Sequence, residues 1–370
     1  MSEHRYAHLE PEPELDDWND RTPSSWAPVD MTDAVAGKDI PAPSLLERTD
    51  GVPLLYPGRV HWIQGESESL KSWVLQLGAA QVLMSGGTCC WIDFEDDDRG
   101  VASRLLALGV PGDLILDQQR FRYLRPDEPL YARDGAALPG FVDLEATVQA
   151  VQWDLVVIDG VTEAMTIEGM ALIDNTDVAR WMRRFPKHIA DTGAAVGVID
   201  HLTKAREGQG RYAIGGQHKL AGVGGAVYKV VATRRLSRAT DGKPVTATST
   251  ITVEKDRPGW VRGKADDGTI AVLEITAYPD GGVTGRLLPP GEANTTPAWS
   301  TCLSVLDYLD QYEGAAKGVI ERDIGGNAEA LRKALQWMVG KQWIEVRKEG
   351  NAHRHYLMAA GRDARDGGGE

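Results

Sequence analysis

Short apolar runs alternate with longer amphipathic segments between Pro57 and Val231. The runs that are hydrophobic without interruption are RVHWIQG, TCCWIDFED, WDLVVIDG and AAVGVIDH. The segments with helical character are KSWVLQLGAAQVLM, VASRLLALG and VARWMRRFPKHIADTG. Continuous hydrophobicity indicates strands that are covered on both faces, because a strand with one face in water alternates instead. The pattern therefore predicts an α/β domain with a mainly parallel sheet.

The pattern becomes that of hairpins between Val245 and Leu288. The strand-like runs here are TATSTITVEKD, TIAVLEITAYPD and GGVTGRLL, and Gly and Asp turns separate them. We expect these antiparallel strands to extend the same sheet.

A third pattern follows the connection PPGEANTTPAW. A first helix carries an apolar stripe that consists of Cys302, Val305, Leu306 and Leu309. A short helix follows from about Val319 to Ile324, and Asn327 is a candidate cap for a third helix, AEALRKALQWMV. The run KQWIEVRKEGNAHRHYLM then predicts a hairpin that turns at Gly350 and Asn351. Three helices and a hairpin in this order predict a winged helix.

The expected domain plan has four parts. Residues 1–44 form an acidic, flexible tail, because they are rich in Pro, Asp and Glu and show no sustained period. Residues 45–290 form the α/β domain, residues 291–360 the winged helix, and residues 361–370 a disordered tail. The content of 42% hydrophobic and 25% charged residues is typical of a globular protein.

Three bulk properties limit the possible functions. No run approaches the ~18 apolar residues of a membrane-spanning helix, and no signal peptide is evident, so we expect a cytoplasmic protein without membrane contacts. The three cysteines have no disulfide or metal-ligand spacing, and we expect the adjacent Cys89 and Cys90 to be core residues. The net charge of −14 argues against a nucleic-acid coat, because phosphate binding is driven by Lys and Arg. Any DNA contact must therefore be local.

A phosphate-binding loop is predicted between the strand VHWIQ and the helix SWVLQLGAAQVL. Backbone N–H groups and the helix N-terminus would cradle phosphates there. Lys71 would reach the β and γ phosphates of ATP, and Ser72 would ligate Mg²⁺. The alternative is a chance Gly and Lys-Ser spacing at a strand-to-helix turn. The loop residues are Gly65, Glu66, Ser67, Glu68, Ser69, Leu70, Lys71 and Ser72.

Leu70 departs from the pattern GxxxxGK, which has glycine at this position. A side chain there can crowd the loop, since glycine tolerates backbone conformations that other residues avoid. The sequence therefore supports ATP binding more strongly than ATP turnover.

Acidic residues follow the predicted strands, at the edge where open α/β sheets bind ligands. Glu95 is the candidate to orient or deprotonate the attacking water. Asp159, which ends the run VVID, is the candidate to hold Mg²⁺ through its water shell, opposite Lys71. The alternative for any single carboxylate is a solvated strand end, which we expect of Asp96, Asp97 and Asp98.

The fourth apolar run ends at Asp200 and His201. His201 is a candidate to sense the γ-phosphate or to relay its loss to the following loop, and a purely structural histidine is the alternative. The Gly-rich segment that follows suits sequence-independent tracking of a DNA phosphate backbone, and its position directly after this strand favours that interpretation over the alternative of a solvated surface loop. Its basic residues are Lys204, Arg206, Arg211, His218 and Lys219.

The predicted winged helix offers a second set of basic residues, on its third helix and on its wing. These could contact DNA, although winged helices also dock proteins. The residues are Arg332, Lys333, Lys348, His353 and Arg354.

Taken in order, these motifs resemble those of the RecA-like ATPases, and among them the DnaB-type and plasmid RepA-type hexameric replicative helicases. The resemblance covers about Pro57 to Arg262 and includes GESESLKS, Glu95, VVIDG, His201 and KDRPG. It implies a RecA-like P-loop fold that uses ATP and Mg²⁺. It also implies a homo-oligomer, a hexameric ring, that acts on DNA. No N-terminal helical primase-binding domain is evident, so the RepA-type plan is the closer one.

The segment KDRPG resembles the basic finger of DnaB-type proteins, which enters the site of the neighbouring subunit. The resemblance implies that Lys255 and Arg257 contact the γ-phosphate across an interface. Such a guanidinium would neutralise charge that develops during phosphoryl transfer. An ordinary charged hairpin is the alternative.

The leading hypothesis is an ATP-driven DNA motor, a hexameric replicative helicase or replication initiator that moves on single-stranded DNA, with replication proteins as possible partners. The alternative is a nucleotide-gated protein for DNA binding, helicase loading or recombination mediation that hydrolyses little ATP. Turnover that depends on single strands distinguishes the two.

Overall fold

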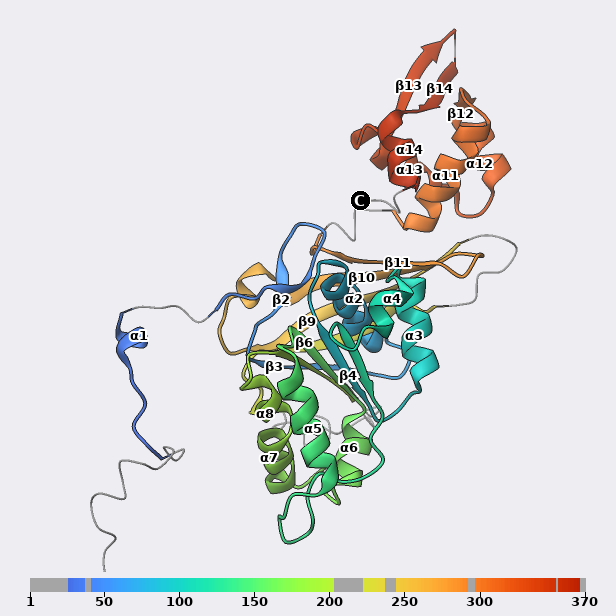
Figure 1. Ribbon diagram of the computed structural model, residues 1–370. Helices are drawn as coiled ribbons and strands as arrows, with labels where there is room; N and C mark the ends of the chain where they lie inside the picture. The colour runs from blue at the N-terminus through green and yellow to red at the C-terminus, as the bar shows by residue number, and fades with distance from the viewer. Residues whose placement is uncertain are drawn as a thin grey trace, which may run out of the picture. The chain divides into compact units, whose positions relative to one another are not determined.

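The computed structural model describes residues 26–36, 41–202, 222–236, 244–291, 297–350 and 352–366 (Figure 1). The chain divides into two compact units, Met1–Ile40 and Pro41–Glu370. The described part of the first unit contains one short helix, α1 (Thr32–Val35), which buries no side chain. The tail expected over residues 1–44 thus includes a helical turn.

A nine-stranded sheet is the centre of the second unit, with the order β11-β10-β9-β8-β3-β7-β6-β4-β5. Six neighbouring strands are parallel: β3 (Val60–Gly65), β4 (Cys89–Asp93), β5 (Phe121–Leu124), β6 (Leu155–Asp159), β7 (Ala195–His201) and β8 (Ala226–Arg234). Three antiparallel strands continue the sheet beyond β8: β9 (Val245–Asp256), β10 (Thr269–Ala277) and β11 (Val283–Leu288). The expected α/β sheet and its antiparallel extension are both confirmed.

Helices cover both faces of this sheet, which is why its central strands are hydrophobic without alternation. One face packs against α2 (Lys71–Met84), α3 (Asp98–Ala107) and α4 (Gly112–Leu116), and the small hairpin of β1 (Leu45–Glu47) and β2 (Pro53–Leu55) joins this layer. The other face packs against α5 (Pro139–Ala150), α6 (Val161–Ile167), α7 (Asn175–Arg184) and α8 (Pro186–Ala190) (Figure 1). Cys89 and Cys90 are buried free thiols, one on each face.

The segment VARWMRRFPKHIADTG forms two helices, where its pattern predicted one. Helix α7 ends at Arg184, and α8 begins at Pro186. Proline lacks an amide hydrogen and disfavours helical backbone at the preceding residue. Phe185 accordingly has φ −122° and ψ −80°, outside the helical region.

The register of the parallel strands brings their carboxyl ends to one edge. Gly65 at the end of β3 pairs with His201 at the end of β7, and Asp93 at the end of β4 pairs with Asp159 at the end of β6. Residues from four distant parts of the chain therefore meet at this edge of the sheet.

The C-terminal part has the expected order of elements: α11 (Trp299–Gln311), β12 (Ala315–Ala316), α12 (Lys317–Ile324), α13 (Ala328–Gly340), β13 (Ile344–Glu349) and β14 (Ala352–Leu357). The strands form a separate sheet with the order β12-β14-β13. The predicted cap is confirmed, because the side chain of Asn327 accepts hydrogen bonds from two amides of α13. The predicted stripe on α11 is buried as well: Cys302, Val305, Leu306 and Leu309.

The disordered tail expected from residue 361 onward is wrong for the described residues. Helix α14 (Ala359–Asp366) occupies this stretch. Arg362 and Arg365 both form ion pairs with Asp310 of α11, so charged side chains hold a helix that lacks an apolar run. Within the described ranges, no helix has the length and the apolar character to cross a membrane.

Candidate nucleotide site

The predicted phosphate loop lies between β3 and α2, as the sequence pattern requires. Gly65 is the last residue of β3, and a side-chain carbon there would lie 2.6 Å from the carbonyl oxygen of Val230. Ser249 of β9 donates a hydrogen bond of 2.7 Å from its hydroxyl to the carbonyl oxygen of Ser69. Neighbouring strands therefore fix the shape of the loop, and only glycine fits at its start.

Leu70 takes the backbone conformation that glycine adopts easily. Its φ of 67° and ψ of 17° are left-handed, which costs a residue with a Cβ roughly 1–2 kcal/mol. Its side chain is 7% exposed and belongs to the core on the α2 face. Apolar burial of Leu70 offsets the strain, and the residue also lines the cleft beside the loop.

Lys71 begins α2 and is only 6% exposed. Burial lowers the pKa of its ammonium group, and nearby carboxylates oppose this shift: Glu95, Asp159 and Asp200. No ion pair joins Lys71 to a carboxylate among the described residues. A cation that is removed from water and still unpaired fits a phosphate ligand.

Asp159 ends β6 and is 4% exposed. Burial raises the pKa of its carboxyl group to about 7, and the charges of Asp93 and Glu95 add to this effect. Its Oδ1 atom is buried and has no hydrogen-bond partner in the described part of the chain. Such a carboxylate lacks a cation, and Mg²⁺ with its water shell would satisfy it. Ser72, the second residue of α2, lines the same cleft as Asp159, and its hydroxyl would be a further ligand for Mg²⁺.

Glu95 lies beside two residues that come from other strands and helices. Nε2 of His201 lies 2.9 Å from its carboxylate. Glu163 of α6 lies beside Glu95 next to Gly160, and burial together with the charge of Glu95 raises the pKa of Glu163. The approach depends on Gly160, because a side-chain carbon there would lie 2.7 Å from Cγ of Glu95. The candidate base is thus positioned by a histidine and lies beside a second carboxylate.

Asp93 and Asp97 have structural roles in the acidic run after β4. Asp93 is fully buried and accepts hydrogen bonds from the amides of Glu95 and Asp96, at 2.9 and 2.8 Å. Asp97 caps α3 by accepting a hydrogen bond from the amide of Gly100. Asp93 therefore fixes the turn that presents Glu95.

A cleft of about 450 Å³ joins the loop to these carboxylates. Its walls include Lys71, Glu95 and Asp159, together with Arg104 and Arg235, which sequence reasoning missed. Arg104 pairs with Asp96 at 3.0 Å, so Asp96 is not simply a solvated strand end. Arg235 pairs with Glu68 of the loop at 2.8 Å. The basic run TRRLSR after a predicted strand was the available signal for Arg235.

The predicted finger lies away from this cleft within one chain. Lys255 pairs with Val227 of β8, and the amide of Arg257 donates to the carbonyl oxygen of Gly225. Val230 of the same strand is the residue opposite Gly65. At about 3.3 Å per residue, Arg257 lies roughly 16 Å along the strand from the start of the loop. The Nζ atom of Lys255 donates to the carbonyl oxygen of Val223 at 3.1 Å.

The candidate DNA contacts divide into two groups. Lys204, Arg206, Arg211, His218 and Lys219 lie outside the described residues. In the C-terminal part, Arg332 pairs with Glu321 and Arg354 pairs with Glu349, which reduces the positive charge that they present. The remaining candidates there are exposed: Lys333, Lys348 and His353.

The nine-stranded sheet, the loop at the end of β3 and the carboxylates at the same edge define a P-loop NTPase of the RecA/AAA-like type. Residues 29–207, just under half of the chain, match the model of the AAA domain. This match indicates nucleotide-dependent ATPase activity. Domains of this type generally bind a nucleotide with Mg²⁺. No curated protein matches the chain.

Proposed function

We propose that the protein is an ATP-driven motor that acts on single-stranded DNA as a homo-oligomeric ring, with a hexamer as the expected state. The separation of KDRPG from the phosphate loop carries this proposal. Arg257 is exposed and about 16 Å along the sheet from Gly65, so a second subunit can present it to the cleft more readily than its own chain can.

The proposed reaction is hydrolysis of the bond between the β and γ phosphates. Glu95 takes a proton from water as the water oxygen attacks the γ-phosphorus, and ADP leaves with the bond electrons. Lys71 neutralises the phosphates from the loop side, and Arg257 of a neighbouring subunit does so from the other side. Mg²⁺, held by Ser72 and through water by Asp159, would offset the remaining negative charge. His201 connects Glu95 to the segment that follows β7.

DNA is proposed as the partner from the basic residues after β7 and in the C-terminal part, which we propose to be a winged helix. Replication proteins are further proposed partners. The chain carries a net charge of −14, so DNA would bind through these local basic regions.

A steady-state ATPase assay with and without single-stranded DNA tests the proposal, together with unwinding of a forked duplex. Stimulation by single strands and ATP-dependent unwinding are the expected results. The Lys71→Ala variant is the control for contaminating activity. Turnover that is insensitive to DNA would contradict the motor.

A second function, nucleotide-gated DNA loading or recombination mediation with little hydrolysis, is favoured by one observation. Two non-glycine residues of the loop, Glu68 and Leu70, have positive φ, of 63° and 67°. A loop with this strain and a buried Leu70 could bind ATP and release it slowly. ATP-dependent DNA binding without turnover would identify this function.

A further inference from the structure

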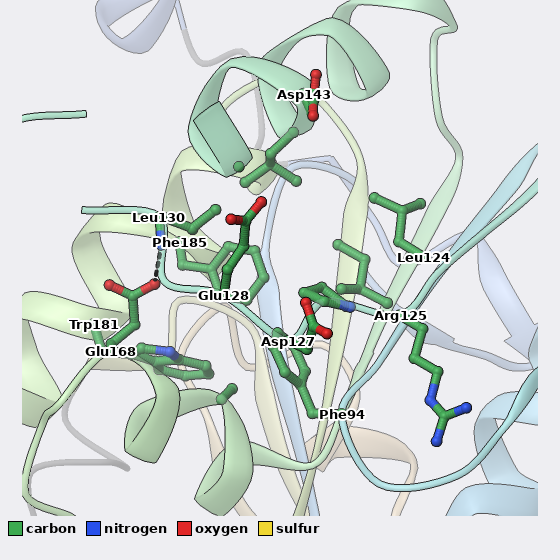
Figure 2. A pocket seen from close by; sticks show the side chains of 15 residues that line it. Phe94, Leu124, Arg125, Asp127, Glu128, Leu130, Asp143, Glu168, Trp181 and Phe185 are labelled. Carbon is green, nitrogen blue, oxygen red and sulfur yellow. Dashed lines mark hydrogen bonds between the residues drawn. The ribbon is translucent and has the colours of Figure 1, made fainter. Parts of the chain in front are cut away.

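A second pocket, of about 260 Å³, lies on the face of the sheet that α5 to α8 cover (Figure 2). Its wall is formed by side chains from the ends of β4 and β5, from the following loop, and from α5 and α7. Aromatic rings make up much of it: Phe94 and Phe185 meet edge to face at 6.2 Å, and Trp181 meets Phe185 at 5.8 Å. The apolar wall residues are Phe94, Leu124, Leu130, Leu144, Trp181 and Phe185.

The polar residues of this pocket are predominantly acidic. Four carboxylates contribute against one guanidinium: Asp127, Glu128, Asp143 and Glu168 against Arg125. Figure 2 shows the side chain of Arg125 extending away from the aromatic rings. No ion pair joins Arg125 to these carboxylates in the described structure. The carboxylates of the lining therefore outnumber its one guanidinium, although Arg184 of α7 also acts on Glu168.

One of these carboxylates, Glu168, has a structural role in the pocket. Its Oε1 accepts a hydrogen bond of 2.6 Å from the amide of Leu130, as Figure 2 shows, and this bond holds the loop over the pocket. Burial raises the pKa of Glu168. Asp127, Glu128 and Asp143 are exposed, so a ligand can reach these three carboxylates.

We propose that this pocket binds a small organic cation, a protonated amine on an aromatic or apolar body. Aromatic faces attract cations, and carboxylates at the rim strengthen the attraction. A volume of about 260 Å³ is close to the lower end of the ~300–1,000 Å³ range of ligand sites, which suits a body of one or two rings.

The pocket shares two structural elements with the nucleotide site. Phe94 lines the pocket and precedes Glu95 in the chain, and its amide donates to the carbonyl oxygen of Asp159 at 2.9 Å. On helix α6, Ala164 lines the pocket and the preceding residue, Glu163, lies beside Glu95. A ligand that packs on Phe94 and α6 therefore stabilises the arrangement in which Glu95 is bound to His201 and lies beside Glu163.

The consequence, which rests on the proposed ATP hydrolysis, is that occupancy of the pocket slows turnover. Glu95 must adjust its position as water attacks the γ-phosphorus, and a filled pocket that fixes Phe94 and α6 opposes that adjustment. Binding itself does not depend on ATP hydrolysis, so the two parts can be tested separately.

Three probes that share an indole ring test the ligand class on the full chain: tryptamine, 3-ethylindole and indole-3-propionate. Binding is measured by calorimetry at fixed ionic strength. Tryptamine should bind about 10-fold more tightly than 3-ethylindole, and indole-3-propionate more weakly than both. Equal affinity of tryptamine and 3-ethylindole would overturn the proposal.

Two variants test whether tryptamine binds in this pocket. Gly140→Leu on α5 fills the pocket, because a side-chain carbon there meets Glu128 and the carbonyl oxygen of Pro129 only at 3.5 and 3.6 Å. It should abolish tryptamine binding, while Val142→Leu at a 62% exposed position of the same helix should not. The double variant Asp127→Asn, Glu128→Gln should reduce the affinity for tryptamine toward that for 3-ethylindole, since Asp143 and Glu168 remain. Full binding by Gly140→Leu would overturn the assignment of the site.

The effect on catalysis is read from ATPase rates at saturating tryptamine. Turnover of the parent chain should fall several-fold, and turnover of Gly140→Leu should be insensitive to tryptamine. The Lys71→Ala variant should still bind tryptamine, which separates failure of the pocket from failure of the proposed ATPase. Binding without any change in turnover would overturn the link to Glu95.

Discussion

Nε2 of His201 lies 2.9 Å from the carboxylate of Glu95, although 106 positions separate the two residues in the chain. The contact joins the end of β7 to the turn after β4. The carboxylate of Glu95 keeps further acceptor positions, so it can receive a proton from water while His201 holds it in place. Any signal that moves the segment after β7 therefore reaches the candidate base directly.

Glu95→Gln should retain nucleotide binding and lose about 10²–10⁴-fold in the hydrolysis rate, because the amide can still accept a hydrogen bond but cannot take a proton. Binding of a fluorescent ATP analogue and single-turnover hydrolysis measure the two effects. Asp98→Asn, at an exposed position of α3, is the matched control. Loss of nucleotide binding in Glu95→Gln would assign Glu95 a structural role instead.

Asp159 should make Mg²⁺-nucleotide binding dependent on pH. Its pKa is raised to about 7 in the folded chain, so at lower pH the group is protonated and the cation must displace that proton. Affinity should rise with pH up to about 7 and then level off. Calorimetry in buffers of different ionisation enthalpy should detect proton release near pH 6. Asp159→Asn should bind weakly and without this proton release, whereas Asp113→Asn, at an exposed position, should behave like the parent.

The same group should destabilise the nucleotide-free fold at high pH. Because the folded pKa of Asp159 lies above its usual value of 3.8, the folded state holds a proton that the unfolded state has lost between about pH 4 and 7. The free energy of unfolding then falls as pH rises through this window. Asp159→Asn should therefore unfold at a higher temperature than the parent chain at pH 8, and show little difference at pH 4. An unchanged difference across this range would contradict the raised pKa.

Much of the fold could be predicted from the sequence, because strands that are buried on both faces consist mainly of apolar residues. The strands β4, β6 and β7 are buried on both faces, so each is a nearly continuous apolar run that ends in a polar residue, and β3 differs only by the buried His61 and its end at Gln64 and Gly65. The phosphate loop was recognisable for a local reason, since a strand, the loop and a helix are consecutive in the chain. The break before Pro186 had a local signal too, although the periodicity suggested one helix.

What the sequence did not reveal depends on strand order. The contact between Glu95 and His201 and the positions of Glu163 and Arg104 follow from which strand lies beside which, and hydrophobic patterns do not encode neighbours. The burial of Leu70 could not be predicted for a related reason, since whether a loop side chain enters the core depends on the direction of its Cβ. Helix α14 was missed because ion pairs to Asp310 hold it in place of an apolar stripe.

The buried side chain of Leu70 stabilises the fold, and its left-handed backbone destabilises it. Two substitutions separate these effects. Leu70→Ala loses apolar burial and keeps the strain, whereas Leu70→Gly loses the same burial and relieves the strain. The glycine variant should therefore be more stable than the alanine variant by roughly 1 kcal/mol. Urea unfolding of both variants measures this difference. An alanine variant as stable as the glycine variant would mean that the loop relaxes.

Tyr56 should act as a positioning residue for KDRPG. Its buried hydroxyl donates to Asp256 at 2.9 Å and accepts from the amides of Trp260 and Val261. Tyr56→Phe leaves these groups unsatisfied, at about 1–3 kcal/mol for a buried group. We expect lower kcat with unchanged nucleotide affinity. Tyr228→Phe is the control, because its buried hydroxyl bonds to the carbonyl oxygen of Leu54 instead. Equal loss of kcat in both variants would indicate a general loss of stability.

Arg257 provides the sharpest test of a shared site between subunits. Its backbone lies near the amino end of β8, away from the phosphate loop of its own chain, so a neighbour must receive its guanidinium if it contributes to hydrolysis. Arg257→Ala should bind ATP almost normally and hydrolyse it poorly, since an arginine supplied across an interface contributes ~10³–10⁵-fold in well-studied cases.

Mixing Arg257→Ala with Lys71→Ala should restore part of the activity, because some interfaces then combine an intact loop from one subunit with an intact finger from the other. The rescue requires subunit exchange and should vanish on dilution below the assembly concentration. The matched control is Arg262→Ala. The guanidinium of Arg262 donates to the carbonyl oxygen of Glu254 within its own chain, so mixing this variant with Lys71→Ala should not raise the ATPase rate above that of the separate proteins. If Arg257→Ala alone hydrolyses ATP like the parent at assembling concentrations and with DNA present, the finger does not act across the interface.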